Sequence, residues 1–353
     1  MRIRPCVLGL LFPALPAALS ADSLQERLSK LPYGIVYEAY HGDNWELFVM
    51  NADGTGKKNL TNTKDSHELY PQASPDGTRI CFVNDAGEGR AVVRSVCVMN
   101  ADGSGRQTIA QYARQPFWSA DSKTIGYLPQ EFRKFNVVDY FSKGMRFYDV
   151  ASGKDRPHQN SARIHHLYNP SFASNGKWIT STVHAGMGYK HAILLIGAEG
   201  EQILDLKLRG CRPCLSPDGK KIAWGEDDHK ISVAELAVDS ATPKPGRRLL
   251  EIVHPKDKIY HVDWAPDSRH LSFSCGVPSK GDITKRDTHE AACEIVGVYA
   301  KGWNILAAAL PEDDGGTGKT IDLTTAGPES FANLTNNGLS NKEPTWLNRT
   351  ARE

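Results

Sequence analysis

The sequence predicts an all-β protein, a six-bladed β-propeller made of four-stranded blades. Three observations predict this fold class. One turn-containing signature recurs at steps of 43 to 54 residues, the segments around each copy alternate between apolar and polar residues, and no long segment shows a helical period. Short strands at this spacing, four to a repeat, are typical of propeller blades, whereas a β-sandwich explains the strands but not a repeat of this length.

The repeated signature is a short apolar segment, a turn rich in Pro, Asp, Asn and Gly, and then alternating apolar residues. Its copies are PQASPDGTRICFV, PFWSADSKTIGYL, PSFASNGKWITST, PCLSPDGKKIAWG and VDWAPDSRHLSFS, at residues 71–83, 116–128, 170–182, 213–225 and 262–274. The steps of 45, 54, 43 and 49 residues join the register marks Ala73, Trp118, Phe172, Leu215 and Trp264. A sixth mark, Trp346 in EPTWLN, follows 82 residues later, so the last step contains an insertion.

A second signature, MNADGTG at residues 50–56 and MNADGSG at 99–105, marks the end of a different strand of the unit. Asp-Gly and Asn-Gly tolerate the positive φ of tight hairpin turns, so both signatures are interpreted as hairpin connectors. In each unit the register mark lies in strand one, the SPDG-like turn leads to strand two, and the NADG turn follows strand three.

The two ends of the chain are predicted to share one blade. The N-terminal region begins with a strand two (GIVYEAY, 34–40), and EPTWLN (343–348) is a strand one without followers. Pairing of these segments closes the ring and leaves no free sheet edge there.

VMNADGTGKKNLT (49–61) followed by YPQASPDGTRICFV (70–83) resembles the WD40-like repeat of TolB-type six-bladed propellers, and NLTNNGLSNKEPTWLN (333–348) is similar to the end of such domains. The resemblance covers residues 33–348 and implies an exported binding propeller. The chain departs from the pattern at about 277–330, an insertion in the fifth blade. It also shows no separate N-terminal α/β domain, so we expect a TolB-like propeller and not a full TolB.

The N-terminus resembles a secretory signal. Arg2 and Arg4 precede an apolar run over residues 6–19, and small residues follow at 18–20. We therefore expect a signal peptide at 1–20, a short lead at 21–32, the propeller at 33–348 and a tail at 349–353. The cleaved chain is expected in the periplasm or outside a bacterial cell, without a transmembrane segment; an uncleaved anchor is the alternative.

The net charge and the cysteine content give further information on the class of protein. A formal net charge of +1 gives no signature of nucleic-acid binding, and 40% apolar residues suffice for a core, so we expect a folded chain. We expect this chain to be a monomer. An even number of cysteines after the signal permits disulfides in an exported protein. The pairings suggested by neighbouring strands and by CxxC spacing are Cys81 with Cys97, Cys275 with Cys293, and Cys211 with Cys214, the last pair being free thiols in the alternative interpretation.

The predicted site lies on the face opposite the repeated turns. Connections between strands four and one, and between strands two and three, vary in length, and function on a rigid scaffold usually lies in such loops. The candidate ligand-binding residues at the channel mouth are His67, Glu68, Arg114, His165, His166, Arg212, His261 and Glu343.

Three chemistries compete with a structural role for these residues. Imidazoles from separate blades would suit a divalent metal, with the candidates His67, His166 and His261. Guanidinium and ammonium groups would suit an acidic ligand, with the candidates Arg114, Arg209, Arg212 and Lys342. Carboxylates would suit acid–base chemistry, with the candidates Glu68, Glu226, Asp227 and Asp228. No spacing marks a catalytic pair, so no catalytic residue is assigned.

The preferred interpretation is an exported binding or scaffold propeller that engages a cell-envelope protein or a carbohydrate without a cofactor. The alternative is a metal-assisted polysaccharide lyase or glycosidase with its site in the central channel. Some pectin-degrading lyases on related propellers use a His-bound metal, but their His-rich repeat text is missing from this sequence.

Overall fold

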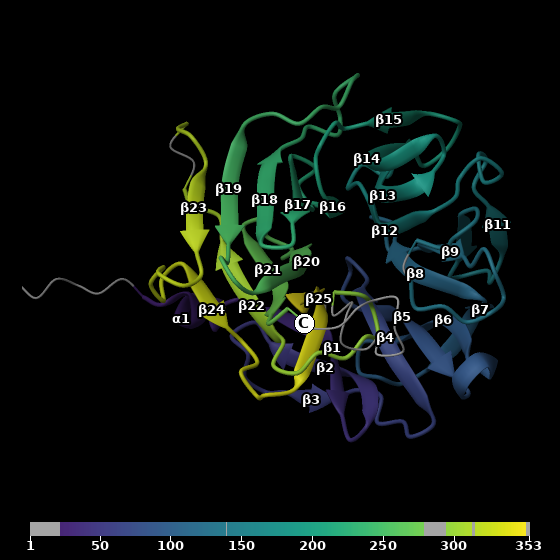
Figure 1. The fold of residues 1–353 in the computed structure, drawn as a ribbon, viewed down its shortest axis with the longest axis horizontal. Helices are drawn as coiled ribbons and strands as arrows, with labels where there is room; N and C mark the ends of the chain where they lie inside the picture. The colour runs from purple at the N-terminus through teal and green to yellow at the C-terminus, as the bar shows by residue number, and fades with distance from the viewer. Residues whose placement is uncertain (1–21, 139, 279–293, 313–314, 351–353) are drawn as a thin grey trace, which may run out of the picture.

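The protein, represented by a computed structural model, is described over residues 22–138, 140–278, 294–312 and 315–350. Its strands form six sheets arranged as a ring around a central axis (Figure 1). Within each sheet the four strands of the blade pair antiparallel in the order in which they leave the axis. The predicted six-bladed β-propeller is confirmed.

The first three blades follow one another along the chain. Blade 1 consists of β4 (Ser66–Ala73), β5 (Arg79–Ala86), β6 (Val93–Asn100) and β7 (Gln107–Gln111). Blade 2 consists of β8 (Ala113–Trp118), β9 (Thr124–Pro129), β10 (Arg146–Asp149) and β11 (Asp155–Pro157). Blade 3 consists of β12 (Leu167–Phe172), β13 (Trp178–Gly186), β14 (Tyr189–Gly197) and β15 (Ile203–Asp205).

The other blades contain the irregular features of the chain. Blade 4 consists of β16 (Cys211–Leu215), β17 (Lys221–Asp227), β18 (Lys230–Glu235) and β19 (Arg248–Val253). Blade 5 consists of β20 (Lys258–Trp264), β21 (His270–Gly276), β22 (Asn304–Ala309) and β24 (Phe331–Asn333). Blade 6 consists of β25 (Ser340–Asn348), β1 (Tyr33–His41), β2 (Asn44–Asn51) and β3 (Lys58–Asn59).

Blade 6 joins the two ends of the chain, as predicted. Ile35 of β1 pairs with Trp346 of β25 on one side and with Met50 of β2 on the other. A strand from the C-terminal end therefore fills the innermost place of a blade whose other strands are N-terminal, which closes the ring.

The innermost strands are β4, β8, β12, β16, β20 and β25. The first five end at the register marks of the repeat, and β25 contains the sixth. Each mark is followed by the turn that leads to strand two, so all of these turns lie at one end of the channel. We call this end the turn face, formed by residues 74–77, 119–122, 173–176, 216–219 and 265–268; the opposite end is the loop face.

The first of these turns shows why its residues are needed. Asp76 accepts hydrogen bonds from the Ser74 hydroxyl (2.6 Å) and the Thr78 amide (3.0 Å), which fixes the turn. Gly77 has φ +71°, and a Cβ there would lie 1.7 Å from the carbonyl oxygen of Asn348 in blade 6. The turn thus requires glycine both for its backbone and for contact with the neighbouring blade.

The core lies between the blades. Between blades 4 and 5, for example, Val233 and Ile252 pack with Leu271 and Phe273. Because both faces of an interior sheet are covered, the middle strands carry continuous apolar runs such as 193–196 of β14.

An excursion between β22 and β24 adds a fifth strand to blade 4. β23 (Lys319–Asp322) pairs parallel with β19, outside the four strands of the blade. Blade 4 is therefore covered at its outer edge by a segment of blade 5, which the local sequence pattern did not indicate.

Two short helical segments accompany the strands. Helix α1 (Leu24–Leu28) begins with a capping box between Ser23 and Glu26 and buries Leu24 and Leu28 against blades 5 and 6. A single 3₁₀ turn, η1 (Gly89–Ala91), lies in the loop after β5. No helix in the described part of the chain is long and apolar enough to cross a membrane.

The predicted Cys81–Cys97 disulfide is not formed, and both thiols are free. Cys81 lies opposite Val98, and Cys97 lies opposite Phe82, so the two cysteines are one position out of register. Their side chains therefore point to opposite faces of the sheet. Cys211 and Cys214 are also free, in agreement with the alternative of two thiols. The Cys275–Cys293 pairing involves a residue outside the described ranges.

Candidate functional site

All six innermost strands are bulged at one equivalent position. The residue three places before each register mark has a positive φ, between 48° and 59°, at Tyr70, Gln115, Asn169, Arg212, His261 and Glu343. A non-glycine residue rarely adopts this conformation, and residues held in it cluster at functional sites. The six residues form a ring that we call the inner ring, and most of its members line a cavity of about 60 Å³ on the axis.

Three predicted site residues meet in the inner ring. His261 Nε2 lies 3.0 Å from Glu343 Oε1, and Arg212 Nη1 lies 4.0 Å from the same oxygen. Nε2 of His261 also lies 2.6 Å from the carbonyl oxygen of Glu294. Because both neighbours of Nε2 are acceptors, this nitrogen carries the proton, and Nδ1 accepts from the Ser274 hydroxyl at 3.1 Å.

His261 is neutral in this setting. Burial lowers its pKa well below the usual value of 6.5, and the positive charges of Arg212 and Lys342 lower the pKa further. The neutral imidazole therefore donates a hydrogen bond to the carbonyl oxygen of Glu294 and lies beside Glu343 of blade 6.

The predicted residues of blade 1 contact their own blade and the neighbouring blade 6. Glu68 is buried and accepts from Thr63, Ser66 and Arg106, the last at 2.8 Å. His67 accepts a hydrogen bond from the amide of Trp45 (3.2 Å).

Arg114 and the paired histidines hold loops in place. Arg114 is buried and donates to the carbonyl oxygens of Asn136 and Val138, which anchors the loop after β9. His165 accepts from the amide of Met187 at 3.0 Å. His166 Nε2 lies 2.9 Å from Glu131 Oε2.

The structure does not bring His67, His166 and His261 together. They lie on blades 1, 3 and 5, and each ring is engaged by a different partner. Within the described ranges, no three His, Cys, Asp or Glu side chains are grouped so that they would hold a metal ion. The metal site predicted from these histidines is therefore not assembled by the fold.

A segment of blade 5 lies across the loop face of the channel. Lys342 is fully buried and donates to the carbonyl oxygens of Ile295 (2.6 Å) and Val298 (2.8 Å). Val298 and Ile295 in turn pack against Val137 of the loop after β9. These contacts cover the inner ring on the side where the sequence had suggested the ligand.

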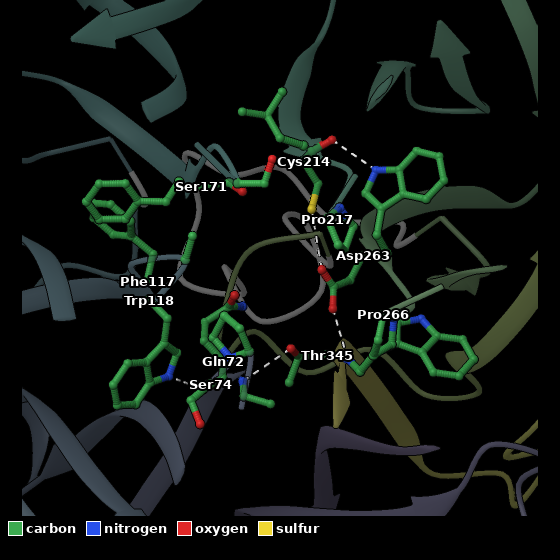
Figure 2. Close-up of a pocket in the computed structure, with 18 of the residues that line it drawn as sticks. Gln72, Ser74, Phe117, Trp118, Ser171, Cys214, Pro217, Asp263, Pro266 and Thr345 are labelled. Carbon is green, nitrogen blue, oxygen red and sulfur yellow. Dashed lines mark hydrogen bonds between the residues drawn. The ribbon is translucent and has the colours of Figure 1, made fainter. Parts of the chain in front are cut away.

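A cavity opens instead on the turn face (Figure 2). It has a volume of about 410 Å³ and shares Gln72, Ser171, Cys214 and Asp263 with the small cavity of the inner ring. Residues one place before the register marks line it; we call them the outer ring: Gln72, Phe117, Ser171, Cys214, Asp263 and Thr345.

Indole rings form part of the cavity wall and are fixed by the backbone of the preceding blade. Trp118 Nε1 donates to the carbonyl of Gln72 (2.9 Å), and Trp264 Nε1 donates to the carbonyl of Cys214 (3.1 Å). Trp346 supplies a third indole. The wall is therefore aromatic, and the two bonded indoles are held before any ligand arrives.

Asp263 is the charged member of the outer ring. Its Oδ2 accepts from the amide of Trp346 (2.9 Å), and its Oδ1 accepts from the Cys214 thiol (3.3 Å), as Figure 2 shows. Burial raises the pKa of Asp263 above its usual value, and burial also raises the pKa of Cys214, so this thiol is no activated nucleophile.

Comparison with solved structures identifies the architecture. TolB from Acinetobacter baumannii superposes with a TM-score of 0.57 at 15% identity, over 89% of this chain and 66% of that one. The fold is a TolB-like six-bladed β-propeller. A chain from a nidogen/laminin complex matches with a TM-score of 0.54 at 9% identity over 90% and 98% of the two chains. Hydrazine synthase from Kuenenia stuttgartiensis matches with a TM-score of 0.53 at 12% identity over 93% and 49%.

These identities show the shared fold of the TolB-like propeller and nothing finer. No protein-family model matches the sequence, and no curated protein does. This chain spans less than two thirds of the length of the A. baumannii TolB chain.

The inner ring and the outer ring of the TolB-like propeller were not predicted from the sequence as sets of equivalent positions. Arg212, His261 and Glu343 were singled out by residue type, but Tyr70 and Asn169 occupy equivalent places. The signal was present, because proline follows the inner-ring residue in five of the six blades and Val262 follows it in the other. The outer ring is marked only by its fixed distance of one residue from the register mark.

Proposed function

We propose that this protein is an exported binding propeller that receives part of a protein partner in the turn-face cavity. The observation that carries the proposal is the cavity of about 410 Å³ on the axis, with a preformed aromatic wall and polar groups at its base. Its size and lining match those of binding pockets, which combine apolar walls with a few fixed polar groups.

Preorganisation supports a binding role. The turns that rim the cavity are held by their own side chains, as in the bond from Ser216 to Asp218 (2.6 Å). The indoles of Trp118 and Trp264 are held by the neighbouring blade. Aromatic anchors in fixed positions bind with little loss of side-chain entropy, which favours affinity.

The nature of the partner is proposed from the fold neighbours. One of them comes from a complex between nidogen and laminin, two proteins. A protein partner is therefore preferred here over the carbohydrate that the sequence left open. The exported location rests on the N-terminal sequence, which lies outside the described residues; N-terminal sequencing of the mature protein from a cell envelope fraction tests it.

The binding test compares two matched substitutions on opposite faces. Ala120 lines the cavity mouth on the turn face, and Ala91 is exposed on the loop face. The wild-type protein is used to capture a partner from an envelope extract, and the dissociation constant of the purified partner is then measured for Ala120→Trp and Ala91→Trp.

We expect Ala120→Trp to weaken binding about tenfold or more by obstructing the cavity, and Ala91→Trp to bind like wild type. If Ala91→Trp loses the partner while Ala120→Trp keeps it, the site lies on the loop face. If both variants bind like wild type, the cavity is not the site.

A further inference from the structure

The carboxylate of Asp263 has no counter-charge among the described residues that line the turn-face cavity. Of the described residues that line the cavity, it is the only one with a charged side chain. Its hydrogen bonds come from neutral donors, namely the amides of Trp346 and Trp264, the Cys214 thiol and the Thr345 hydroxyl. Within the described ranges, no Lys, Arg or His nitrogen lies within 4.0 Å of its carboxylate.

Several buried carboxylates of this propeller have a cationic neighbour, whereas the buried Glu46 accepts hydrogen bonds from the neutral side chains of Asn44 and Thr61. The pairs are Glu38 with Lys342 (3.8 Å), Glu68 with Arg106 (2.8 Å), Asp85 with Arg94 (2.7 Å) and Glu343 with Arg212 (4.0 Å). A buried carboxylate without such a neighbour is costly, because it loses hydration and gains no opposite charge. The fold thus places a cation beside several carboxylates, and none of the described residues places one within 4.0 Å of Asp263, which is half-buried and faces the cavity.

The raised pKa of Asp263 has the same cause. Burial disfavours its ionised form, and the neutral hydrogen-bond donors only partly offset that effect. A cation brought into the cavity would favour the ionised form and would itself be stabilised by it. The nearby indole rings add to this preference, because the face of an indole attracts cations.

We propose that the cavity binds a basic side chain, lysine or arginine, of the partner polypeptide, with Asp263 as its counter-charge. This assignment rests on the proposed function, since it names the group that a protein partner inserts. Asp263 and the aromatic wall select for charge and length, while the turn-face rim contacts the rest of the partner.

Short capped peptides test the assignment without knowledge of the partner. The probes are acetyl-Gly-Lys-Gly-amide, its Arg, Gln and Glu counterparts, and glucosamine as a cation that is not a peptide. Three indoles line the cavity, so tryptophan fluorescence reports occupancy, and calorimetry gives the dissociation constant.

The first variant removes the charge. In Asp263→Asn, the side chain keeps an oxygen that can accept from the Trp346 amide. We expect the Lys or Arg peptide to bind wild type about tenfold or more tightly than the Gln peptide, and to lose that advantage in Asp263→Asn. Its affinity for wild type should also fall as the pH is lowered, because Asp263 becomes protonated.

A second pair of variants keeps the test decisive if Asp263→Asn folds poorly. The Thr345 hydroxyl bonds to Asp263, so Thr345→Lys would supply an internal ammonium group, whereas Thr345→Met has similar length and no charge. Thr345→Lys should abolish the preference for the basic peptide, and Thr345→Met should keep it. Circular dichroism and the melting temperature verify the fold of each variant.

Several results would overturn the assignment. These are equal binding of the Lys and Gln peptides, an unchanged preference in both Asp263→Asn and Thr345→Lys, and no saturable binding of either basic peptide. Tighter binding of glucosamine than of both basic peptides would overturn the polypeptide assignment. Each of these leaves the outcome of the Ala120→Trp experiment unaffected, so failure of this inference is distinguishable from failure of the proposed function.

Discussion

Replacement of Lys342 by methionine should strongly destabilise the propeller. The ammonium group of Lys342 is fully buried, donates to the carbonyl oxygens of Ile295 and Val298, and lies 3.8 Å from Glu38 Oε1. Glu38 is also fully buried, and it accepts a hydrogen bond from the amide of Tyr70 (2.9 Å). Lys342→Met removes the cation and leaves this carboxylate without its counter-charge.

The expected loss of stability is about 3–5 kcal/mol, the usual cost of breaking a buried ion pair by removing one partner. The lost hydrogen bonds to the two carbonyl oxygens are part of that figure, because all of these contacts involve the same ammonium group. Removing the second charge as well should restore part of the loss. We expect Lys342→Met with Glu38→Gln to be about 1–3 kcal/mol more stable than Lys342→Met alone.

The pH dependence follows from Glu38. Burial raises the pKa of Glu38 above its usual value of 4.5, and the positive charge of Lys342 opposes that rise. Without Lys342 the pKa rises further. Since a raised pKa in the folded state means that stability is lost as the pH increases, the deficit of Lys342→Met should be smallest below about pH 4.5 and should grow above it.

Denaturant titration monitored by tryptophan fluorescence measures these effects, and Lys30→Met is the matched control. Lys30 pairs with Asp22 at 2.8 Å, but both side chains are well exposed, so no measurable change is expected. The reasoning is refuted if Lys342→Met changes the free energy of unfolding by less than about 1 kcal/mol, or if the added Glu38→Gln brings no recovery.

Two further predictions concern His261 and the cysteines. Because the folded state holds the pKa of His261 well below 6.5, the unfolded chain takes up a proton first as the pH falls, and stability should decrease below about pH 6.5. In His261→Gln that decrease should be shallower when unfolding midpoints are measured across this range; an unchanged slope would contradict it. Cys81 and Cys97 are buried free thiols, so an alkylating reagent should label both after denaturation without reduction, and neither in the native protein. Mass spectrometry of the labelled peptides measures this, and a Cys81–Cys97 crosslink would disprove it.

The architecture was accessible from the sequence because its determinants are local and repeated. The register marks end five of the innermost strands, and the predicted pairing of the chain ends is formed by Ile35 and Trp346. Strand β23 was not accessible in the same way. Its residues suggest a strand, but its parallel partner β19 lies about 70 residues earlier, and no local pattern specifies that pairing.

The site was harder to predict because its location depends on tertiary contacts. Residue type selected Arg212, His261 and Glu343 among eight candidates, and the fold brings these three together. It did not show that Lys342 binds the carbonyl oxygens of 295 and 298 and so holds a segment across the loop face. Those acceptors are backbone atoms, which carry no side-chain signature. The open cavity consequently lies at the opposite end of the channel from the variable loops.

The regularity of the turn face also bears on specificity. Ser74 and Ser216 are bonded to the Asp residues of their own turns, so these side chains hold the rim rather than discriminate between ligands. Discrimination must then come from positions that vary while the rim stays constant. The outer ring has that property, since one equivalent position holds Gln72, Phe117 and Asp263 in different blades. A constant rim with a variable ring separates folding from recognition, and exchange of outer-ring residues should therefore alter ligand choice with less effect on stability than changes in the turns.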